Sequence, residues 1–217
     1  HGVADKRQTR LTLAAASVSI PETFAVGTGN VPIPYPLTDD QWVGRPAHHA
    51  QGRRLVVGNT ADCVRQVNSW GGGYISRLIN KVAEYRVMVV QGRAVWVAKK
   101  TPGNPNDVAW NVARGGRFDN VPWAEWPLRV VKEAIKANDT MGTDFSGVDV
   151  MVDAEGTPYV LELNSAPSQT SPYRQACVAK AFKWIIDKNT KATIPLMTER
   201  GGYRKFAHPA VVADAVV

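Results

Sequence analysis

The sequence predicts an α+β protein of two lobes, and three observations support this fold class. Two stretches alternate apolar and polar residues on either side of a turn, as antiparallel hairpins do, at residues 84–100 and 147–164. Segments with helical spacing of apolar residues lie before, between and after them. The run Trp70-Gly71-Gly72-Gly73 contains three consecutive glycines, whose backbone is flexible, and it predicts a hinge. We therefore expect an N-terminal lobe at residues 1–72, a C-terminal lobe at 73–190 and a tail at 191–217.

The elements expected within the lobes follow from local signals. A first helix is predicted at residues 6–16 because Asp5 is a good N-cap residue. Helices are also predicted at residues 127–138, with the stripe Leu128, Val131 and Ile135, and at residues 174–188, with the stripe Val178, Phe182 and Ile185. Short strands are expected at residues 23–26 and 54–57, and long loops at 27–40 and 101–126.

Composition excludes several classes of protein. The 217 residues are 44% hydrophobic and 21% charged, which is typical of a folded chain. The net charge of +7 suits an anionic partner, whether a nucleotide, a nucleic acid or an acidic peptide. No apolar run is long enough for a membrane helix, and no leader peptide is evident. Cys63 and Cys177 are too few for a disulfide framework or a zinc site, so we expect a cytoplasmic protein.

The second hairpin predicts a cluster of oxygen ligands. Apolar alternation favours a register in which Val150 lies opposite Leu163, and Asp149 then lies opposite Asn164. Asp149, Glu162 and Asn164 would share the other face, and such oxygen donors suit Mg²⁺ or Mn²⁺. The alternative is a solvated polar face. Repulsion between the two carboxylates without a cation weakens that alternative, so the pattern alone leaves both readings open.

The first hairpin predicts a second polar cluster. A three-residue turn at Gln91-Gly92-Arg93 would place Glu84, Arg86 and Lys100 on one face. A carboxylate for ribose hydroxyls beside a cation for phosphates would suit a nucleotide. An exposed cross-strand ion pair explains the same pattern, and on the pattern alone it is the favoured explanation.

In order, these segments resemble the ATP-grasp superfamily of carboxylate–amine ligases, especially its branch similar to the ribosomal-protein glutamate ligases. The resemblance rests on residues 5–10, on 44–52, on 84–87 with 99–100, and on 111–116 with 147–149 and 161–164. The most specific block is Gly147-Val148-Asp149 followed by Leu161-Glu162-Leu163-Asn164. The resemblance implies the ATP-grasp fold, in which two α/β lobes with antiparallel sheets clasp a nucleotide. The family usually has a further N-terminal domain, which we expect this chain to lack.

The resemblance also implies roles for individual residues. ATP and Mg²⁺ (or Mn²⁺) are the implied cofactors, and residues 74–81 are implied to line the adenine pocket. Lysine is usual in the family at the positions of Arg10 and Arg45. Arginine keeps the positive charge, and its planar guanidinium group can donate paired hydrogen bonds to a phosphate. The implied assignments are metal binding by Asp149, Glu162 and Asn164, nucleotide binding by Arg10, Arg45, Glu84, Lys100 and Asn111, and catalysis by Arg114 and Lys100.

The implied activity is ATP-dependent amide or peptide-bond formation. A carboxylate would be activated as an acyl phosphate and transferred to an amine, with ADP and phosphate released, the substrates being amino acids or peptides. Two alternatives stay open: a phosphotransferase acting on a hydroxyl with the same site, and a basic module that binds nucleic acid or another polyanion without catalysis. The last is disfavoured because such a module has no need of Glu162 and Asn164 in an otherwise apolar strand.

Overall fold

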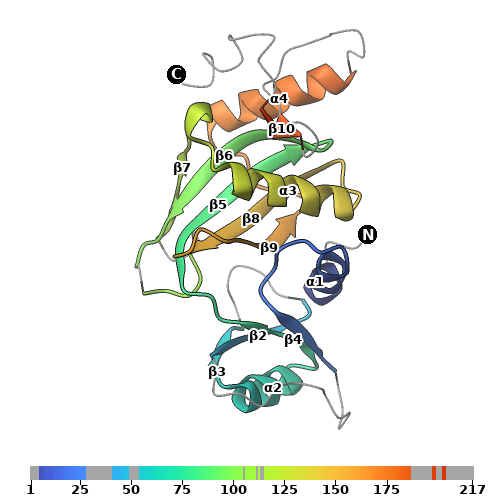
Figure 1. Ribbon diagram of the computed structural model, residues 1–217, viewed down its shortest axis with the longest axis vertical. Helices are drawn as coiled ribbons and strands as arrows, with labels where there is room; N and C mark the ends of the chain where they lie inside the picture. Colours follow the sequence, from blue (N-terminus) through green and yellow to red (C-terminus); the bar gives the residue numbers. More distant parts are fainter. Residues whose placement is uncertain are drawn as a thin grey trace.

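Two antiparallel sheets form the framework of the chain. The computed structural model describes residues 5–27, 41–48, 54–104, 106–110, 112, 115–186, 197–198 and 202–203. Within these ranges the strands form one sheet of four strands and one of seven, and the larger sheet lies above the smaller in Figure 1. The predicted α+β class is confirmed.

The small sheet comes from the N-terminal part of the chain. It contains β1 (Thr23–Val26), β2 (Trp42–Pro46), β3 (Val56–Gly58) and β4 (Gly73–Arg77), in the order β1-β4-β2-β3. Helix α2 (Thr60–Ser69), which the sequence analysis missed, packs Cys63 and Val67 against Trp42 and Ile75. A signal for this helix was present, because the side chain of Asn59 caps it by accepting the backbone N–H of Asp62 at 2.9 Å.

The large sheet carries both predicted hairpins. Its strands are β5 (Lys81–Val90), β6 (Arg93–Thr101), β7 (Arg117–Asn120), β8 (Phe145–Asp153), β9 (Pro158–Asn164), β10 (Met197–Thr198) and β11 (Gly202–Tyr203). Their order is β11-β10-β6-β5-β8-β9, and β7 also pairs with β6. Strand β7 lies within the predicted loop 101–126, as does a short 3₁₀ helix, Trp123–Glu125. The described part of the predicted tail, β10 and β11, extends the sheet through pairing of Met197 with Ala94.

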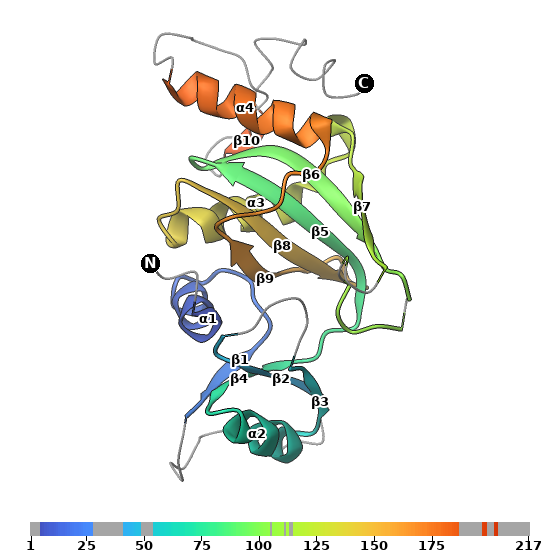
Figure 2. The ribbon, with the colours of Figure 1, turned by 180° about the vertical axis from the view of Figure 1, so that it is seen from behind.

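Helices cover both faces of the large sheet. Helix α3 (Leu128–Thr140) packs on the face that carries Val87 and Val97, and α4 (Pro172–Ile186) packs on the face that carries Met88 and Trp96. Figures 1 and 2 show the two helices on opposite sides of the strands. Among the described residues, no helix is both long and apolar enough to cross a membrane.

The face under α4 continues into the polar cluster. Side chains alternate along a strand, so Glu84 and Arg86 on β5 share the face of Met88. Helix α4 covers only one end of this face (Figure 2), where its residues Cys177 and Ala181 are buried. The other end is left facing the small sheet, and the polar residues of β5 and β6 gather there.

The first helix joins the large sheet instead of the small one. Helix α1 (Lys6–Ala15) begins after Asp5, whose side chain accepts the N–H of Gln8 at 3.0 Å, as predicted. Leu13 and the following Val18 belong to the core under α3. Strand β4 pairs within the small sheet, so the chain passes between the sheets at residues 78–80 and not at Trp70–Gly73.

The first hairpin differs from its predicted turn. Gln91 and Gly92 form a two-residue turn with φ values of 43° and 68°, so Val90 pairs with Arg93 instead of Ala94. A bulge at Met88/Val89 then restores the predicted pairing of Arg86 with Ala98.

The predicted register of the second hairpin is wrong by two residues at Asp149 and by three at Val150. Asp149 pairs with Glu162, not with Asn164, and a bulge at Asp149/Val150 turns Leu161 away from the apolar face. The cause is a short turn in which Asp153 Oδ1 accepts the N–H of Thr157 at 2.7 Å. A shift by two residues preserves the faces, so Asp149, Glu162 and Asn164 still lie on one surface.

The predicted helix stripes are partly wrong. Val131 and Ile135 of α3 are fully buried, but Leu128 is 40% exposed. On α4, Phe182 is 36% exposed, and the buried apolar positions among the described side chains are the smaller Cys177 and Ala181. Because small residues face Trp96 of β6, the helix lies close to the sheet at this point.

Candidate functional site

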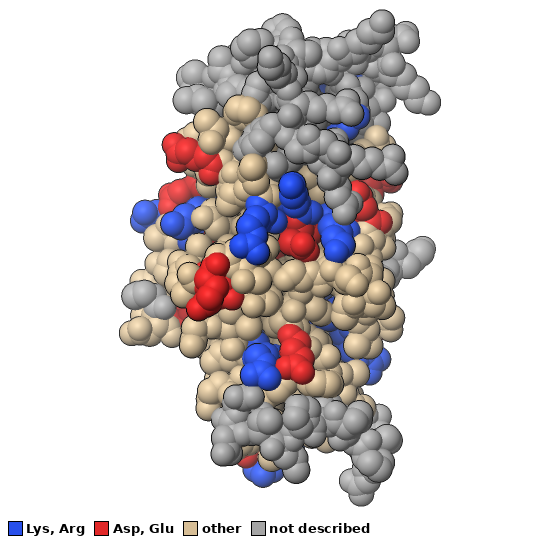
Figure 3. Space-filling model, viewed as in Figure 1, with Lys and Arg blue, Asp and Glu red and all other residues tan. Residues whose placement is uncertain are grey.

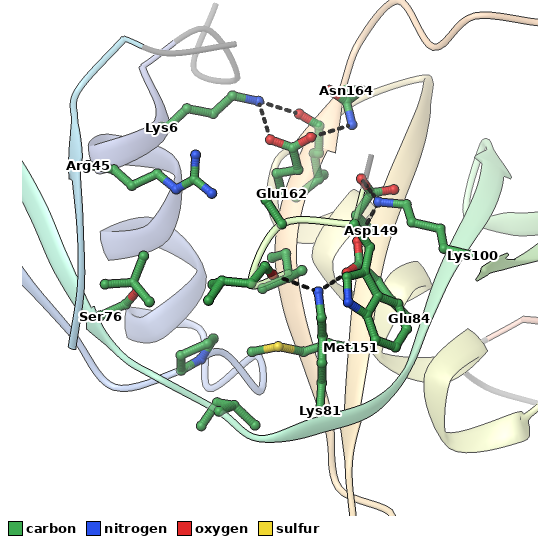
Figure 4. A pocket seen from close by; sticks show the side chains of 18 of the residues that line it. Lys6, Arg45, Ser76, Lys81, Glu84, Lys100, Asp149, Met151, Glu162 and Asn164 are labelled. Atoms are coloured by element: carbon green, nitrogen blue, oxygen red, sulfur yellow. Dashed lines mark hydrogen bonds and ion pairs between the residues drawn. The ribbon is translucent and has the colours of Figure 1, made fainter. Parts of the chain in front are cut away.

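A cavity of about 860 Å³ lies between the two sheets. Helix α1, strands β2 and β4 and the crossing at 78–79 line one side, and strands β5, β6, β8 and β9 line the other. The lining also includes Pro21, residues 108–110 and 112, Phe118 of β7 and residues 165–166. Figure 4 shows Arg45 and Ser76 of the small sheet opposite Glu84, Asp149 and Glu162 of the large sheet.

All the predicted site residues that the structure describes line this one cavity. They come from four separate parts of the sequence and are Arg10, Arg45, Glu84, Lys100, Asp149, Glu162 and Asn164. Two predicted residues, Asn111 and Arg114, lie outside the described residues, as does most of the predicted phosphate loop, residues 49–52. Two neighbours of Asn111 in the sequence, Trp110 and Val112, do line the cavity.

Asp149 is the most tightly held carboxylate of the cavity. Arg86 donates to both of its oxygens, from Nε to Oδ1 at 2.6 Å and from Nη2 to Oδ2 at 2.7 Å. Lys100 Nζ donates to Oδ2 at 2.8 Å. Asp149 is only 2% exposed, so a fork of charge-assisted hydrogen bonds compensates the loss of hydration.

These contacts determine the charge state of the cluster. Burial acts to raise the pKa of Asp149, but the Lys100 and Arg86 cations outweigh it and hold the pKa well below its usual range. Burial likewise acts to lower the pKa of Lys100, and the Asp149 and Glu84 carboxylates raise it above its ordinary value. Asp149, Lys100 and Arg86 are therefore all charged at neutral pH.

Glu84 connects two lysines of the cavity lining. It is 3% exposed, and its carboxylate accepts from Lys100 through Oε1 and from Lys81 through Oε2. The Lys81 ammonium also donates to Val108 O at 3.0 Å and lies 4.4 Å from the centre of the Trp110 ring. Burial lowers the pKa of Lys81, and the Glu84 carboxylate opposes that shift.

Glu162 and Asn164 form the more open part of the predicted metal site. Asn164 Nδ2 donates to Glu162 Oε1 at 3.1 Å, which leaves the amide oxygen of Asn164 as a ligand atom. Lys6 Nζ lies 3.4 Å from Glu162 Oε2. No group of three His, Cys, Asp or Glu side chains in the described ranges could hold a metal, so the third donor would be this amide oxygen. Two carboxylates and one amide oxygen on adjacent strands fit Mg²⁺.

Arg10 is a buried cation with unused hydrogen-bond donors. It is 7% exposed, and its Nη2 donates to Leu161 O at 2.9 Å. Its Nε and Nη1 are buried without a hydrogen-bond partner, while its guanidinium lies 5.0 Å from the centre of the Tyr74 ring. Buried donors of a charged group are costly to leave unpaired, so this position favours an anionic ligand in the cavity.

Sequence reasoning assigned no individual role to four cations of the cavity: Lys6, Arg77, Lys81 and Arg86. Arg86 could have been assigned, because alternation already placed it on the face of Glu84 and Lys100. Lys6 had a signal too, since it lies four residues before Arg10 on the same face of the first helix. Arg77 and Lys81 lie in the segment 74–81 that was expected to line the adenine pocket, but strand alternation did not place Lys81 beside Glu84, because a bulge lies between Lys81 and Ala83.

The cavity carries a surplus of positive charge. Its described lining contains seven Lys or Arg and three Asp or Glu side chains, a surplus of four positive charges. By contrast, the face in Figure 3 shows Lys and Arg side chains interspersed with Asp and Glu over the described residues. The cavity, unlike that face, therefore concentrates the positive charge that would suit a polyanion.

The comparison with protein families defines the class of this chain. Residues 51–187 match the RimK-like ATP-grasp domain, which covers more than half of the sequence. The chain therefore belongs to the RimK-like ATP-grasp family, in agreement with the resemblance found in the sequence.

Two relatives are named as ligases. The chain is 28% identical over 203 residues to the probable alpha-L-glutamate ligase 2 of Shewanella denitrificans, a match that covers 87% of this chain and 65% of that protein. It is 34% identical over 85 residues to the probable alpha-L-glutamate ligase of Aeromonas salmonicida, covering 39% of this chain and 27% of that protein. The chain thus spans just under two thirds of the length of the first relative.

Solved structures confirm the ATP-grasp fold. D-alanine–D-alanine ligase from Bacillus anthracis, complexed with ATP, superposes with a TM-score of 0.63 at 19% identity, covering 86% of this chain and 65% of that one. L-amino acid ligase from Bacillus licheniformis gives a TM-score of 0.57 at 18% identity, covering 76% and 40%. The ligase PsnB, complexed with a phosphomimetic variant of a minimal precursor, Mg and ADP, gives 0.54 at 16% identity, covering 83% and 59%.

Proposed function

We propose that this protein is an ATP-dependent carboxylate–amine ligase and that the cavity between the sheets binds ATP. One observation carries the proposal: a surplus of four positive charges faces a pair of carboxylates on adjacent strands inside one cavity. A triphosphate needs the cations, and Mg²⁺ needs the oxygen donors. The names of the two relatives support the same reaction class and make L-glutamate the first amine to test.

The phosphate groups would be held by cations from both sheets. Arg45 enters from β2 and Lys100 from β6, and Arg10 offers Nε and Nη1, which have no hydrogen-bond partner. Glu84 would bind the ribose, because each of its oxygens keeps a second lone pair while it holds Lys81 and Lys100.

Asp149, Glu162 and Asn164 would hold Mg²⁺. When bound, the ion would neutralise phosphate charge and orient the terminal phosphoryl group. Before the ion binds, cations of this chain neutralise the carboxylates of that site. Arg86 and Lys100 form ion pairs with Asp149, and Lys6 forms one with Glu162. A polyphosphate that attracts these cations would leave the carboxylates free for the metal.

The reaction proposed here needs positioning and charge stabilisation more than it needs a catalytic nucleophile. The substrate carboxylate attacks the γ-phosphorus of ATP, ADP leaves, and an acyl phosphate forms. The amine then attacks the acyl carbon, and phosphate leaves from a tetrahedral intermediate. We assign stabilisation of the developing charge to Lys100 and to Arg114, and nucleotide contact to Asn111.

Calorimetric titration with ATP, with and without Mg²⁺, tests the nucleotide site directly. The wild type should bind ATP at one site in an Mg²⁺-dependent manner, and Glu162→Gln should weaken binding about tenfold or more. Asp62→Asn is the matched control, because Asp62 pairs with Arg65 on the surface of α2 and is 51% exposed. If the wild type binds no ATP, or if Glu162→Gln binds as the wild type does, the assignment is wrong.

Product analysis then separates the ligase from the two alternatives. A ligase releases one phosphate for each amide formed from a carboxylate and L-glutamate or another amine. A phosphotransferase leaves a stable phosphoester and no free phosphate. A polyanion-binding module would show binding that falls steeply with salt and ignores Mg²⁺.

A further inference from the structure

The ring of Phe118 is the common contact of three cations. Phe118 lies on β7, lines the cavity and pairs in register with Lys100 of the neighbouring strand. The centre of its ring lies 4.8 Å from Arg86 Cζ, 5.5 Å from Lys100 Nζ and 5.6 Å from Arg174 Cζ. An aromatic ring attracts a cation at such distances through the negative potential of its π system.

Two of these cations are the partners of Asp149. Arg86 and Lys100 both donate to its carboxylate, and they repel each other, which opposes the charged form of Lys100. Asp149 thus contacts two like charges, of which Lys100 is also held by Glu84. The ring of Phe118 offers both cations a further attractive contact besides their carboxylate partners.

The third cation fixes the ring in place. Arg174 of α4 is 7% exposed; it donates to Phe118 O at 3.0 Å and to Asn120 Oδ1 at 2.8 Å. Its guanidinium also lies 5.0 Å from the centre of the Trp96 ring in the core under α4. Arg174 of α4 therefore contacts both the backbone and the ring of Phe118. These contacts hold the ring in a fixed position against Arg86.

We propose that Phe118 is a positioning residue: its ring orients Arg86 and Lys100 toward Asp149 and toward the ligand of the cavity. The benefit for Mg-ATP binding rests on the function proposed above, whereas the effect on Arg86 does not. The residue acts through Arg86 and Lys100 and makes no chemical contribution of its own.

The hydrogen exchange of Arg86 Nε–H tests this directly, because that hydrogen is donated to Asp149 Oδ1 at 2.6 Å. Nuclear magnetic resonance of ¹⁵N-labelled protein measures the exchange rate, and the spectrum of Arg86→Lys identifies the signal. Phe118→Leu should raise the rate about tenfold, and Phe118→Tyr, which keeps the ring, should leave it within about twofold.

Phe145→Leu is the matched control. Phe145 is, like Phe118, a partly buried ring packed on the core under α4, but it packs edge-to-face on Phe182 at 5.6 Å. A general loosening of the core would affect Arg86 equally in both leucine variants. A positioning role affects it only in Phe118→Leu.

Fluorinated phenylalanines at position 118 keep the test independent of folding. Successive fluorine atoms weaken the attraction of the ring for cations at nearly constant shape, so the exchange rate of Arg86 should rise with each substitution. Unchanged exchange in this series, or in Phe118→Leu, would overturn the inference.

Calorimetry with Mg-ATP gives the second readout. Phe118→Leu should weaken binding about tenfold, and Phe118→Tyr should bind within about twofold of the wild type. If the wild type itself binds no Mg-ATP, the proposed function fails, and the exchange rates still decide the role of Phe118. If exchange changes and affinity does not, Phe118 orders Arg86 without assisting the ligand, and the ligand part of the inference is refuted.

Discussion

Replacing Asp149 by asparagine should destabilise the fold substantially. The substitution keeps the shape of the side chain but removes the charge that compensates Arg86 and Lys100, whose side chains are 17% and 7% exposed. Removing one partner of a buried ion pair typically costs about 3–5 kcal/mol. We expect the lower end, about 3 kcal/mol, because Lys100 keeps its contact with Glu84. For a chain of this length that corresponds to a fall in Tm of about 6–12 °C.

Urea denaturation at pH 7, followed by circular dichroism, measures the free energy of unfolding of both proteins. Asp62→Asn, which removes an exposed carboxylate from α2, should change it by less than about 1 kcal/mol. Adding Arg86→Met to Asp149→Asn should recover part of the loss, since it removes a buried cation that has lost its partner. A variant within about 1 kcal/mol of the wild type would refute the view that Asp149 is the centre of the cluster.

The pH dependence provides a further check with a defined sign. The pKa of Asp149 is lower in the folded state than its value of about 3.9 in the unfolded chain. Its ionisation therefore stabilises the fold fully above that unfolded-state value, and the contribution is lost as the pH falls toward the lower pKa of the folded state. The difference in stability between wild type and Asp149→Asn should be constant from pH 7 to about 5 and should shrink below about pH 4. If the difference in stability between the two proteins shrank between pH 7 and 5, a group other than Asp149 would be responsible for the pH dependence.

Two further predictions concern the parts that hold the site in place. Gly44→Ala should lower the free energy of unfolding by about 1–3 kcal/mol in urea denaturation, because a Cβ there would lie 2.7 Å from Val56 Cγ1, whereas Gly27→Ala, with nothing within 4 Å, should not. If Gly44→Ala and Gly27→Ala had the same free energy of unfolding, the small sheet would have to shift at no cost to accommodate the added methyl group. Asn138→Ala should cost about 2 kcal/mol, because this side chain is 1% exposed and accepts from Ser146 Oγ at 2.7 Å. Differential scanning calorimetry measures the loss; a Tm equal to that of the wild type would contradict the importance of this link between α3 and β8.

Much of the site could be predicted from the sequence, because strand alternation is robust. Glu84, Arg86 and Lys100 were expected on one face, and the structure joins Lys100 to Glu84. Asp149, Glu162 and Asn164 were expected together although their register was wrong by two residues. A shift of two residues does not change the face on which a side chain lies, since side chains along a strand repeat every two residues.

The local errors also have physical causes. A turn with two residues of positive φ and two bulges determined the registers, and turn geometry of this kind depends on backbone conformation more than on the apolar pattern. Strand β7 lay hidden in a segment predicted to be a loop, because its four residues, Arg117–Asn120, include only one apolar side chain. Pairing with β6 stabilises this strand, and no local preference of the sequence indicates that pairing.

The sequence by itself determined the family, the fold class and the two polar strand faces, because those depend on motifs and on short-range periodicity. Only the tertiary structure decided how these faces are completed. It placed α1 on the large sheet, so that Lys6 reaches Glu162, and it brought Arg45 of the small sheet to the opposite wall of the cavity. It also placed Phe118 against Arg86 and Arg174, residues 32 and 56 positions away along the chain. Such contacts arise from the packing of two sheets and a helix, and a pattern that repeats every two or four residues carries no information about them.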